Sequence, residues 1–294
     1  MPKIYAGTAG WSYKDWVPNF YPKTQSKDFN WLRFYSQYFN LVEVNASFYA
    51  YLNPKIVNGW VEKVADVEDF LFSVKLHQDF THKRKFNVQN IKAFQINLDI
   101  LKKSERLGGL LIQFPYSFGY NNTSAEYIGN LKEIFQNHNL FVEVRHSSWN
   151  TKEAVEFFKG MSLTFCTIDQ PQIGKAIPFQ PIVTNDKVYI RFHGRNKEEW
   201  KKSINNFGKE QSYERQSERY KYLYLPGELI DIDQKLREVY DKVKEVFVIM
   251  NNHPTGYAVA NAFELLYLLK ERTKMKIPET SLKAFPRLAS ISSN

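Results

Sequence analysis

Charged side chains alternate with apolar ones in several short β-rich segments of the sequence. In segment 187–193 the even positions are apolar, whereas Arg191 and His193 occupy odd positions. Because successive side chains of a strand point to opposite faces, these two polar residues lie on one face together. The same alternation pairs Glu43 with Asn45, Lys75 with His77, and Glu143 with Arg145. Each segment therefore offers groups that can bind charge or move a proton.

Together with the acid that ends segment 163–169, these groups form one set of candidate catalytic residues. The set consists of Glu43, Lys75, His77, Glu143, Arg145, Asp169, Arg191 and His193. An unpaired buried charge costs several kcal/mol, so such groups must neutralise one another, bind a ligand, or do both. Three acids balance three fixed bases, and the two histidines are expected to titrate near neutrality. A self-neutralising ion-pair network that only fills the interior is the alternative to a functional site.

The three fixed cations suit the binding of an anion. Lys75, Arg145 and Arg191 could hold a phosphate or a carboxylate through charge-assisted hydrogen bonds. Glu143, Asp169 or a histidine could then move a proton on the bound molecule.

A divalent metal ion is the competing use of the same groups. The candidate ligands are His77, Glu143, Asp169 and His193, a set that suits zinc or manganese with one position left for water. The sequence contains no close pair such as HExxH, and three nearby cations would repel the ion. The three fixed cations therefore slightly favour an anion site over a metal site.

Aromatic and amide side chains follow the same segments and are candidates for substrate binding. They are Trp11, Tyr13, Asn45, Tyr49, Gln113, Trp149, Arg195, Asn251 and Asn252. Exposed aromatic rings can stack on a base or a sugar, and amides can orient hydroxyl groups. The alternative is that most of the aromatic rings are ordinary packing.

Eight β-rich runs alternate with segments of helical periodicity, which predicts the scaffold for these residues. The runs are 3–8, 41–47, 70–77, 108–114, 140–145, 163–169, 187–193 and 245–251. Eight such units in one chain of 294 residues predict a single TIM-type (β/α)₈ barrel spanning 1–294. The sixth helix is expected to be degenerate, because 170–186 is rich in proline and has no helical stripe. An open doubly wound sheet is the alternative, but no glycine-rich phosphate loop supports it.

The connection from 195 to 226 is longer and more polar than a usual barrel loop. It carries four tyrosines at positions 213, 220, 222 and 224. In a barrel the residues that follow a strand lie at the face where barrel enzymes build their sites. We therefore expect this connection at the rim, as a lid or as a static insertion.

Composition limits the class of protein and of partner. Forty Lys and Arg residues against 31 Asp and Glu give a net charge of +9, which favours an anionic small molecule or a nucleic acid as partner. The single cysteine, Cys166, cannot form an internal disulfide, which suits a reducing cytoplasm. No apolar run is long enough for a membrane span, and no signal pattern begins the sequence, so we expect a cytoplasmic protein.

Ordered motifs along nearly the whole chain resemble one family, the YecE-like proteins, also called domain of unknown function 72. They are GTAGWSY at 7–13, FYP at 20–22, EVNASFY at 43–49, FSVK at 72–75, TH at 81–82, LIQFP at 111–115, EVRHSSW at 143–149, YIRFHGR at 189–195 and NNH at 251–253. Ala9, Ala46 and Ser47 depart from the family's usual residues by exchanges of one small side chain for another. The resemblance implies a TIM-type barrel but no particular reaction.

The sequence thus predicts an enzyme that acts on an anionic substrate at the carboxyl ends of the barrel strands. The substrate classes are a phosphorylated sugar, a nucleotide or a nucleic acid, and the chemistry is acid-base or metal-assisted. Hydrolase, lyase and isomerase activities all stay open. The alternative function is non-catalytic binding of nucleic acid through the basic surface.

Overall fold

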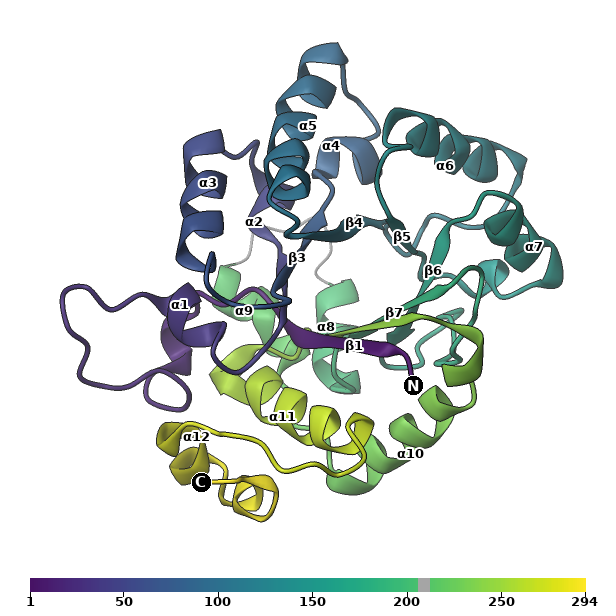
Figure 1. Ribbon diagram of the computed structural model, residues 1–294. Helices are drawn as coiled ribbons and strands as arrows, with labels where there is room; N and C mark the ends of the chain where they lie inside the picture. Colours follow the sequence, from purple (N-terminus) through teal and green to yellow (C-terminus); the bar gives the residue numbers. More distant parts are fainter. Residues whose placement is uncertain (206–211) are drawn as a thin grey trace.

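The computed structural model describes residues 1–205 and 212–294, and its centre is a closed barrel of eight parallel strands (Figure 1). The strands are β1 (Lys3–Ala9), β2 (Leu41–Val44), β3 (Leu71–Lys75), β4 (Leu107–Gln113), β5 (Leu140–Glu143), β6 (Thr164–Asp169), β7 (Lys187–Phe192) and β8 (Glu245–Met250). Each strand pairs with the next, and β8 pairs with β1, so the sheet has no free edge. The predicted (β/α)₈ barrel is confirmed.

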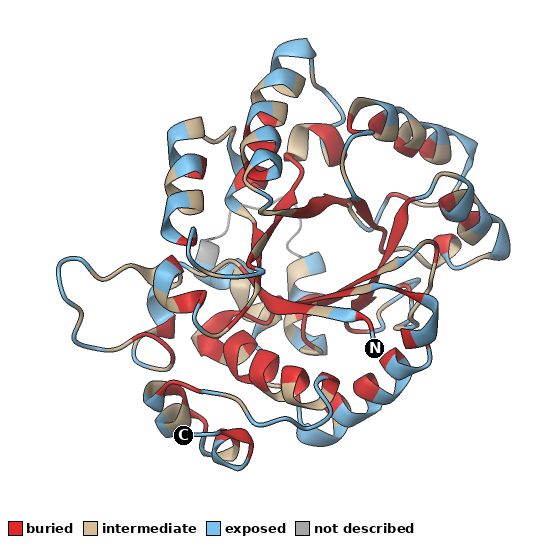
Figure 2. Ribbon diagram, viewed as in Figure 1, coloured by how far each residue is buried: buried red, intermediate tan, exposed pale blue. Residues whose placement is uncertain are grey.

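Helices surround the barrel and cover the outer face of the strands (Figure 1). The helices that follow successive strands are α1 (Trp31–Tyr35), α3 (Pro54–Lys63), α5 (Val88–Lys103), α6 (Asn122–Ile134), α7 (Lys152–Gly160), α10 (Pro226–Arg237) and α11 (Tyr257–Leu269). Short helices α2 (Ala46–Tyr49) and α4 (Gln78–Thr81) follow β2 and β3 directly, and α12 (Glu279–Ala284) lies near the C-terminus. In Figure 2 most of the outer helices are buried on the side that faces the barrel and exposed on the other side, whereas α11 is buried over most of its length.

Side-chain caps begin several of these helices. The Asn53 side chain accepts a hydrogen bond from the Lys55 amide at the start of α3, where Pro54 supplies the first helical residue. The Thr151 side chain accepts from the Ala154 amide at the start of α7. Such caps satisfy amides that have no partner within the helix, so they fix the point at which each helix begins.

The sixth unit has no helix in segment 170–186, as the sequence predicts. Thr184 ties this segment to the barrel instead. Its hydroxyl donates to the carbonyl oxygen of Leu163 at 2.6 Å and accepts from the Phe165 amide at 3.0 Å. The segment thus reaches β7 along the side of the barrel without a helical turn.

Stacked aromatic rings fill the barrel at the level of Tyr189. The ring of Tyr189 lies 4.3 Å from that of Phe141, and Phe141 lies 5.1 Å from Phe247, which stacks on Tyr5 at 4.9 Å. All four rings are buried. The next inward-facing position along β7 is Arg191, so an apolar layer ends where a charged layer begins.

The connection from 195 to 226 contains α8 (Lys197–Asn205) and α9 (Tyr213–Ser217), which lie behind the strands in Figure 1. The part of the predicted rim connection at 206–211 lies outside the described residues. Trp200 of α8 is buried, with its ring 6.4 Å from that of His193. Helix α8 therefore lies over the carboxyl end of β7. No helix in the described part of the chain is long and apolar enough to cross a membrane.

Candidate anion-binding site at the barrel mouth

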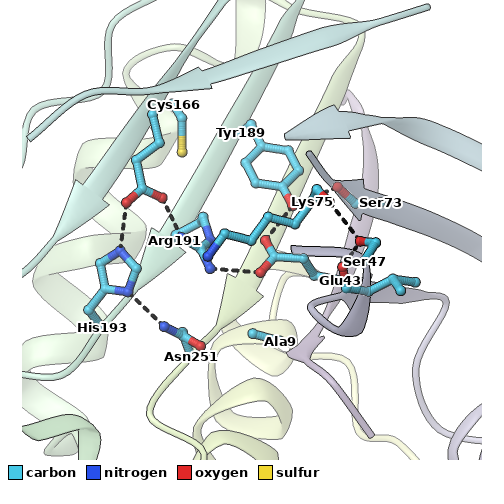
Figure 3. Close-up of polar contacts among 12 residues, drawn as sticks. Ala9, Glu43, Ser47, Ser73, Lys75, Cys166, Tyr189, Arg191, His193 and Asn251 are labelled. Carbon is cyan, nitrogen blue, oxygen red and sulfur yellow. Dashed lines mark hydrogen bonds and ion pairs between the residues drawn. The ribbon is translucent and has the colours of Figure 1, made fainter. Parts of the chain in front are cut away.

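Arg191 lies between two buried glutamates at the centre of the barrel (Figure 3). Its Nη2 donates to Glu43 Oε1 at 2.7 Å, and its Nη1 donates to Glu143 Oε2. Although burial opposes ionisation, the positive charges of Arg191 and Arg145 hold the pKa of Glu143 well below its usual range. Glu143 is therefore ionised, and it shares the Arg191 guanidinium with Glu43.

A second guanidinium completes the charge balance. Arg145 Nε donates to Glu143 Oε1 at 2.8 Å, and its Nη2 lies 2.7 Å from the same oxygen. Two arginines thus face two glutamates, and these four side chains have no net charge. The self-neutralising network that the sequence analysis treated as an alternative is present among them.

His193 is enclosed beside this network. Its Nδ1 lies 2.9 Å from Asn251 Nδ2, and its Nε2 lies 3.3 Å from Glu143 Oε1. Burial lowers the pKa of His193 to about 3, despite the opposing effect of Glu143. The imidazole is therefore neutral at physiological pH, and the expectation that it titrates near neutrality is wrong.

Tyr189 supports the network from the aromatic layer. Its hydroxyl donates to Glu43 Oε2 at 2.9 Å and also contacts Ser73 Oγ at 2.8 Å (Figure 3). Each oxygen of Glu43 thus has a partner, so the carboxylate is fixed in one orientation.

A pocket of about 110 Å³ opens above this network. Its lining consists of Tyr13, Asn45, Tyr49, Lys75, Gln113, Arg191, Gln216, Ser217, Arg219, Tyr220, Asn251 and His253. Four of these side chains are basic, namely Lys75, Arg191, Arg219 and His253, and burial lowers the pKa of His253 to about 4, so it is neutral at pH 7. None of the lining residues named here is an aspartate or a glutamate. Among the described residues, Asn45 Oδ1 and Arg191 Nε are also buried with no protein hydrogen-bond partner. The pocket thus presents positive charge and unsatisfied polar atoms.

Lys75 ends β3 and is 9% exposed. Its carbonyl oxygen accepts a hydrogen bond from Ser47 Oγ at 2.7 Å, and its Nζ lies 4.1 Å from the centre of the Phe48 ring. Burial, and then the nearby charge of Arg191, lower the pKa of Lys75 to about 7. The amine is thus close to half protonated at neutral pH.

Arg219 approaches the pocket from the 195–226 connection. Its Nη1 donates to Ser203 Oγ at 3.0 Å, and its guanidinium lies 4.7 Å from the Tyr220 ring and 5.3 Å from the Trp200 ring. Within 1–205 and 212–294, no carboxylate forms an ion pair with Arg219 or with Lys75. These two cations are the uncompensated charge of the pocket.

The structure brings most of the predicted site residues together. Lys75, Arg191, Tyr13, Asn45, Tyr49, Gln113 and Asn251 line the pocket. Glu43, Glu143, Arg145 and His193 contact Arg191 or one another directly beneath it. The inward parity of the strands accounts for this convergence.

Asp169 and Arg195 form a separate cluster. Arg195 Nε and Nη2 each donate to Asp169 at 2.9 Å, and Arg195 Nη1 donates to Glu228 Oε1 at 2.7 Å. The Tyr224 hydroxyl also donates to Asp169. These contacts tie the end of β6 to the start of α10, and neither Asp169 nor Arg195 lines the pocket.

His77 also lies outside the network. Its ring stacks on Tyr51 at 4.1 Å, and its Nδ1 lies 3.1 Å from Asp79 Oδ2. Burial lowers the pKa of His77 from its ordinary value, despite the opposing charge of Asp79.

Three other predicted residues take part in packing. Trp149 is fully buried, and its Nε1 donates to the carbonyl oxygen of Phe118 at 2.8 Å. Trp11 packs edge-on against Trp60 at 5.3 Å. Asn252 Nδ2 donates to the carbonyl oxygen of Tyr222 and to Asn261 Oδ1, both at 2.8 Å.

The predicted metal ligands do not converge. His77 and Asp169 lie in two different clusters, while Glu143 and His193 lie beside Arg145 and Arg191. In the part of the chain that the structure describes, no three His, Cys, Asp or Glu side chains are placed to hold a metal ion. The donor set therefore does not fit a resident divalent ion.

Five pocket residues were not among the sequence candidates: Gln216, Ser217, Arg219, Tyr220 and His253. His253 directly follows Asn251 and Asn252 in the same motif. Its position just after β8 could therefore have predicted that it lies at the pocket. The other four come from the 195–226 connection. The sequence of this connection has no regular pattern from which its path over the barrel could be predicted.

Comparison with known proteins identifies the family. The family described as "Protein of unknown function DUF72" matches residues 5–284. The chain belongs to the DUF72 family. The resemblance seen in the sequence motifs is therefore confirmed, and the DUF72 match includes every residue that lines the pocket.

Two curated relatives support the DUF72 assignment. The chain is 32% identical to "UPF0759 protein YunF" of Bacillus subtilis over 278 residues, which cover 90% of this chain and 94% of that protein. It is 28% identical to "UPF0759 protein YecE" of Escherichia coli K12 over 151 residues, which cover 51% of each chain.

Solved structures of DUF72 proteins share the fold. A DUF72 family protein of Thermotoga maritima superimposes with a TM-score of 0.78 at 30% identity, over 91% of this chain and 99% of that one. A DUF72 family protein of Enterococcus faecalis gives a TM-score of 0.77 at 26% identity, over 91% of this chain and 95% of that one.

Proposed function

We propose that this DUF72 protein is an enzyme that binds a small anionic molecule at the barrel mouth and transfers a proton on it. The observation that carries the proposal is the charge of the pocket. Lys75, Arg191 and Arg219 line it. Among the described residues no carboxylate lines it, and of these three cations Arg191 alone pairs with carboxylates. A bound phosphate or carboxylate would supply the missing negative charge.

The pocket volume limits the size of the molecule. Its volume of about 110 Å³ exceeds that of a few water molecules but is smaller than the sites of drug-sized ligands. A phosphate or carboxylate with a short carbon chain is the substrate class that fits.

Lys75 is the group best suited to move the proton. A general acid or base works best when its pKa lies near the working pH, and Lys75 has a pKa of about 7. Glu143 and His193 are held in one protonation state by their surroundings.

We place the reaction in the cytoplasm, where the free, buried Cys166 would stay reduced.

Calorimetric titration with inorganic phosphate tests the binding step. Arg219→Met is expected to weaken phosphate binding about tenfold or more, since a charge-assisted contact contributes about 1.5–3 kcal/mol. Arg215→Met is the matched control, because Arg215 lies on the same connection and pairs with Glu199 at 3.1 Å. Equal phosphate affinity in the wild type and in the Arg219 variant would remove the basis of the proposal.

Salt dependence separates this function from nucleic-acid binding. A protein that follows a nucleic-acid backbone releases many counterions, so its affinity falls steeply as salt rises. An enclosed site for one anion responds weakly. Titrations of a phosphorylated compound and of single-stranded DNA at two salt concentrations are expected to show a weak dependence for the first and no tight binding for the second.

A further inference from the structure

Lys75 lines the pocket at the barrel mouth. It leaves the carboxyl end of β3, flanked by Asn45 after β2 and by Gln113 at the end of β4, and all three line the pocket. Figure 3 shows the Lys75 side chain extending over the network around Arg191. A ligand in the pocket therefore lies beside Nζ.

The surroundings of Lys75 differ from those of the other buried cations. Arg191 and Arg145 both pair with glutamates, whereas Lys75 has a Phe48 ring on one side and no carboxylate partner among the described residues. Burial without a counter-ion penalises the ammonium form and favours the neutral amine. A neutral lysine amine in an apolar setting beside another cation is an activated nucleophile.

We propose that Lys75 forms an imine with the carbonyl carbon of a short aldehyde or ketone that carries a phosphate or carboxylate group. The inference rests on the proposed function for the anion contact and adds the carbonyl group and the covalent step. Arg219 and the unpaired Arg191 Nε face the anion, and the amides of Asn45, Gln113 and Asn251 are available to neighbouring oxygens of the substrate.

The step needs no oxidant or reductant. The lone pair of Nζ attacks the carbonyl carbon, a C–N bond forms, and the carbonyl oxygen takes up a proton to give a carbinolamine. The nitrogen lone pair then forms the C=N bond as the hydroxyl group leaves as water. The two protons lost from the amine end on that water, exchanged through solvent or through the phenol of Tyr220, which lines the same pocket.

Reductive trapping tests the imine. The protein is incubated with glycolaldehyde phosphate and sodium cyanoborohydride, and the modified lysines are mapped by peptide mass spectrometry. Lys75 is expected to be labelled about tenfold faster or more than exposed lysines, because far more of its amine is unprotonated at pH 7. Lys244 and Lys283, each with a side chain 81% exposed, are the reference lysines within the same molecule.

Two further experiments distinguish imine formation by Lys75 from anion binding alone. Inorganic phosphate is expected to protect Lys75 but not Lys244 or Lys283, and glycolaldehyde without the phosphate is expected to label Lys75 much more slowly. Lys75→Arg keeps the positive charge, so it should still bind phosphate in calorimetry while losing one adduct per chain.

Labelling of Lys75 no faster than of the two reference lysines, with phosphate binding intact, would overturn the imine and leave the anion site standing. Absence of phosphate binding in the wild type would overturn the proposed function itself. If phosphate did not slow the labelling of Lys75, the inference would likewise be contradicted, because the carbonyl compound would then not occupy the anion pocket.

Discussion

Lys75 and Arg191 face one pocket from opposite strands of the barrel, and within the described part of the chain only Arg191 of the two has carboxylate partners. The neutralised arginine therefore still repels a proton on the lysine, and it is the largest charge effect that lowers the Lys75 pKa after burial itself. The guanidinium of Arg191 stays charged in any environment, whereas Lys75, buried beside it without a carboxylate partner among the described residues, is the cation that titrates.

Lys75→Met is expected to stabilise the protein most at low pH. The pKa of Lys75 falls from 10.5 in the unfolded chain to about 7 in the folded one. Below pH 7 both states bind the proton, and the full cost of burying the ammonium acts. Between pH 7 and 10.5 the unfolded state binds more protons, so the wild type gains stability as pH rises.

Urea denaturation at pH 6 and pH 9 measures this difference. The stability gain of Lys75→Met is expected to shrink by on the order of 2 kcal/mol between the two pH values. Lys244→Met, at an exposed position, serves as the control and should show no comparable change. An equal effect of Lys75→Met at both pH values would mean that the lysine keeps its ordinary pKa.

Arg191→Met is expected to destabilise the fold by about 3–5 kcal/mol, because it leaves two buried carboxylates without their shared cation. Adding Glu43→Gln to this variant should recover part of the loss, since one uncompensated charge is then removed. Denaturant midpoints of the single and double variants measure the coupling. A double variant less stable than Arg191→Met would show that Glu43 is not held through Arg191.

The imidazole of His193 is expected to stay neutral from pH 5 to pH 8. Burial lowers its pKa to about 3, so its NMR signals should not move over this range. His146, which is partly buried and hydrogen-bonded to Ser148, provides a second imidazole in the same spectra. A His193 titration with a midpoint near the ordinary histidine value of about 6.5 would contradict the enclosed geometry.

Phosphate is expected to slow trypsin cleavage within the connection 195–226, at residues such as Lys202 and Arg215. Arg219 and Tyr220 line the pocket from this connection, so a bound anion would hold it against the barrel. Arg219→Met should abolish the protection. Equal cleavage rates with and without saturating phosphate would identify the connection as a static insertion and not as a lid.

The barrel and the centre of the site could be predicted because both depend on a local property. Strand parity alone aims Glu43, Lys75, Glu143 and Arg191 inward, whatever their partners are. Strand parity does not determine which other side chains each of these residues contacts, however. Asp169 ends β6 where the connection after β7 brings Arg195 to it, so it anchors α10 and does not line the pocket.

The aromatic residues show the same limit. Trp149 and Tyr13 both follow strands, yet only Tyr13 lines the pocket, because Phe118 and Phe158 enclose Trp149. Arg219 was missed for a related reason. Its approach to the pocket depends on its contacts with the rings of Trp200 and Tyr220 at the barrel mouth. No repeating pattern in the sequence relates these residues, so the contacts could not be predicted from it.

The aromatic layer around Tyr189 and Phe141 has a kinetic consequence. These stacked rings fill the barrel beneath the charged network, so they close the pocket on that side. In the proposed reaction, substrate and product would therefore enter and leave through the same opening, and both would occupy the same anion pocket. A turnover product that keeps the anionic group should inhibit competitively, with an inhibition constant that follows the affinity for free phosphate.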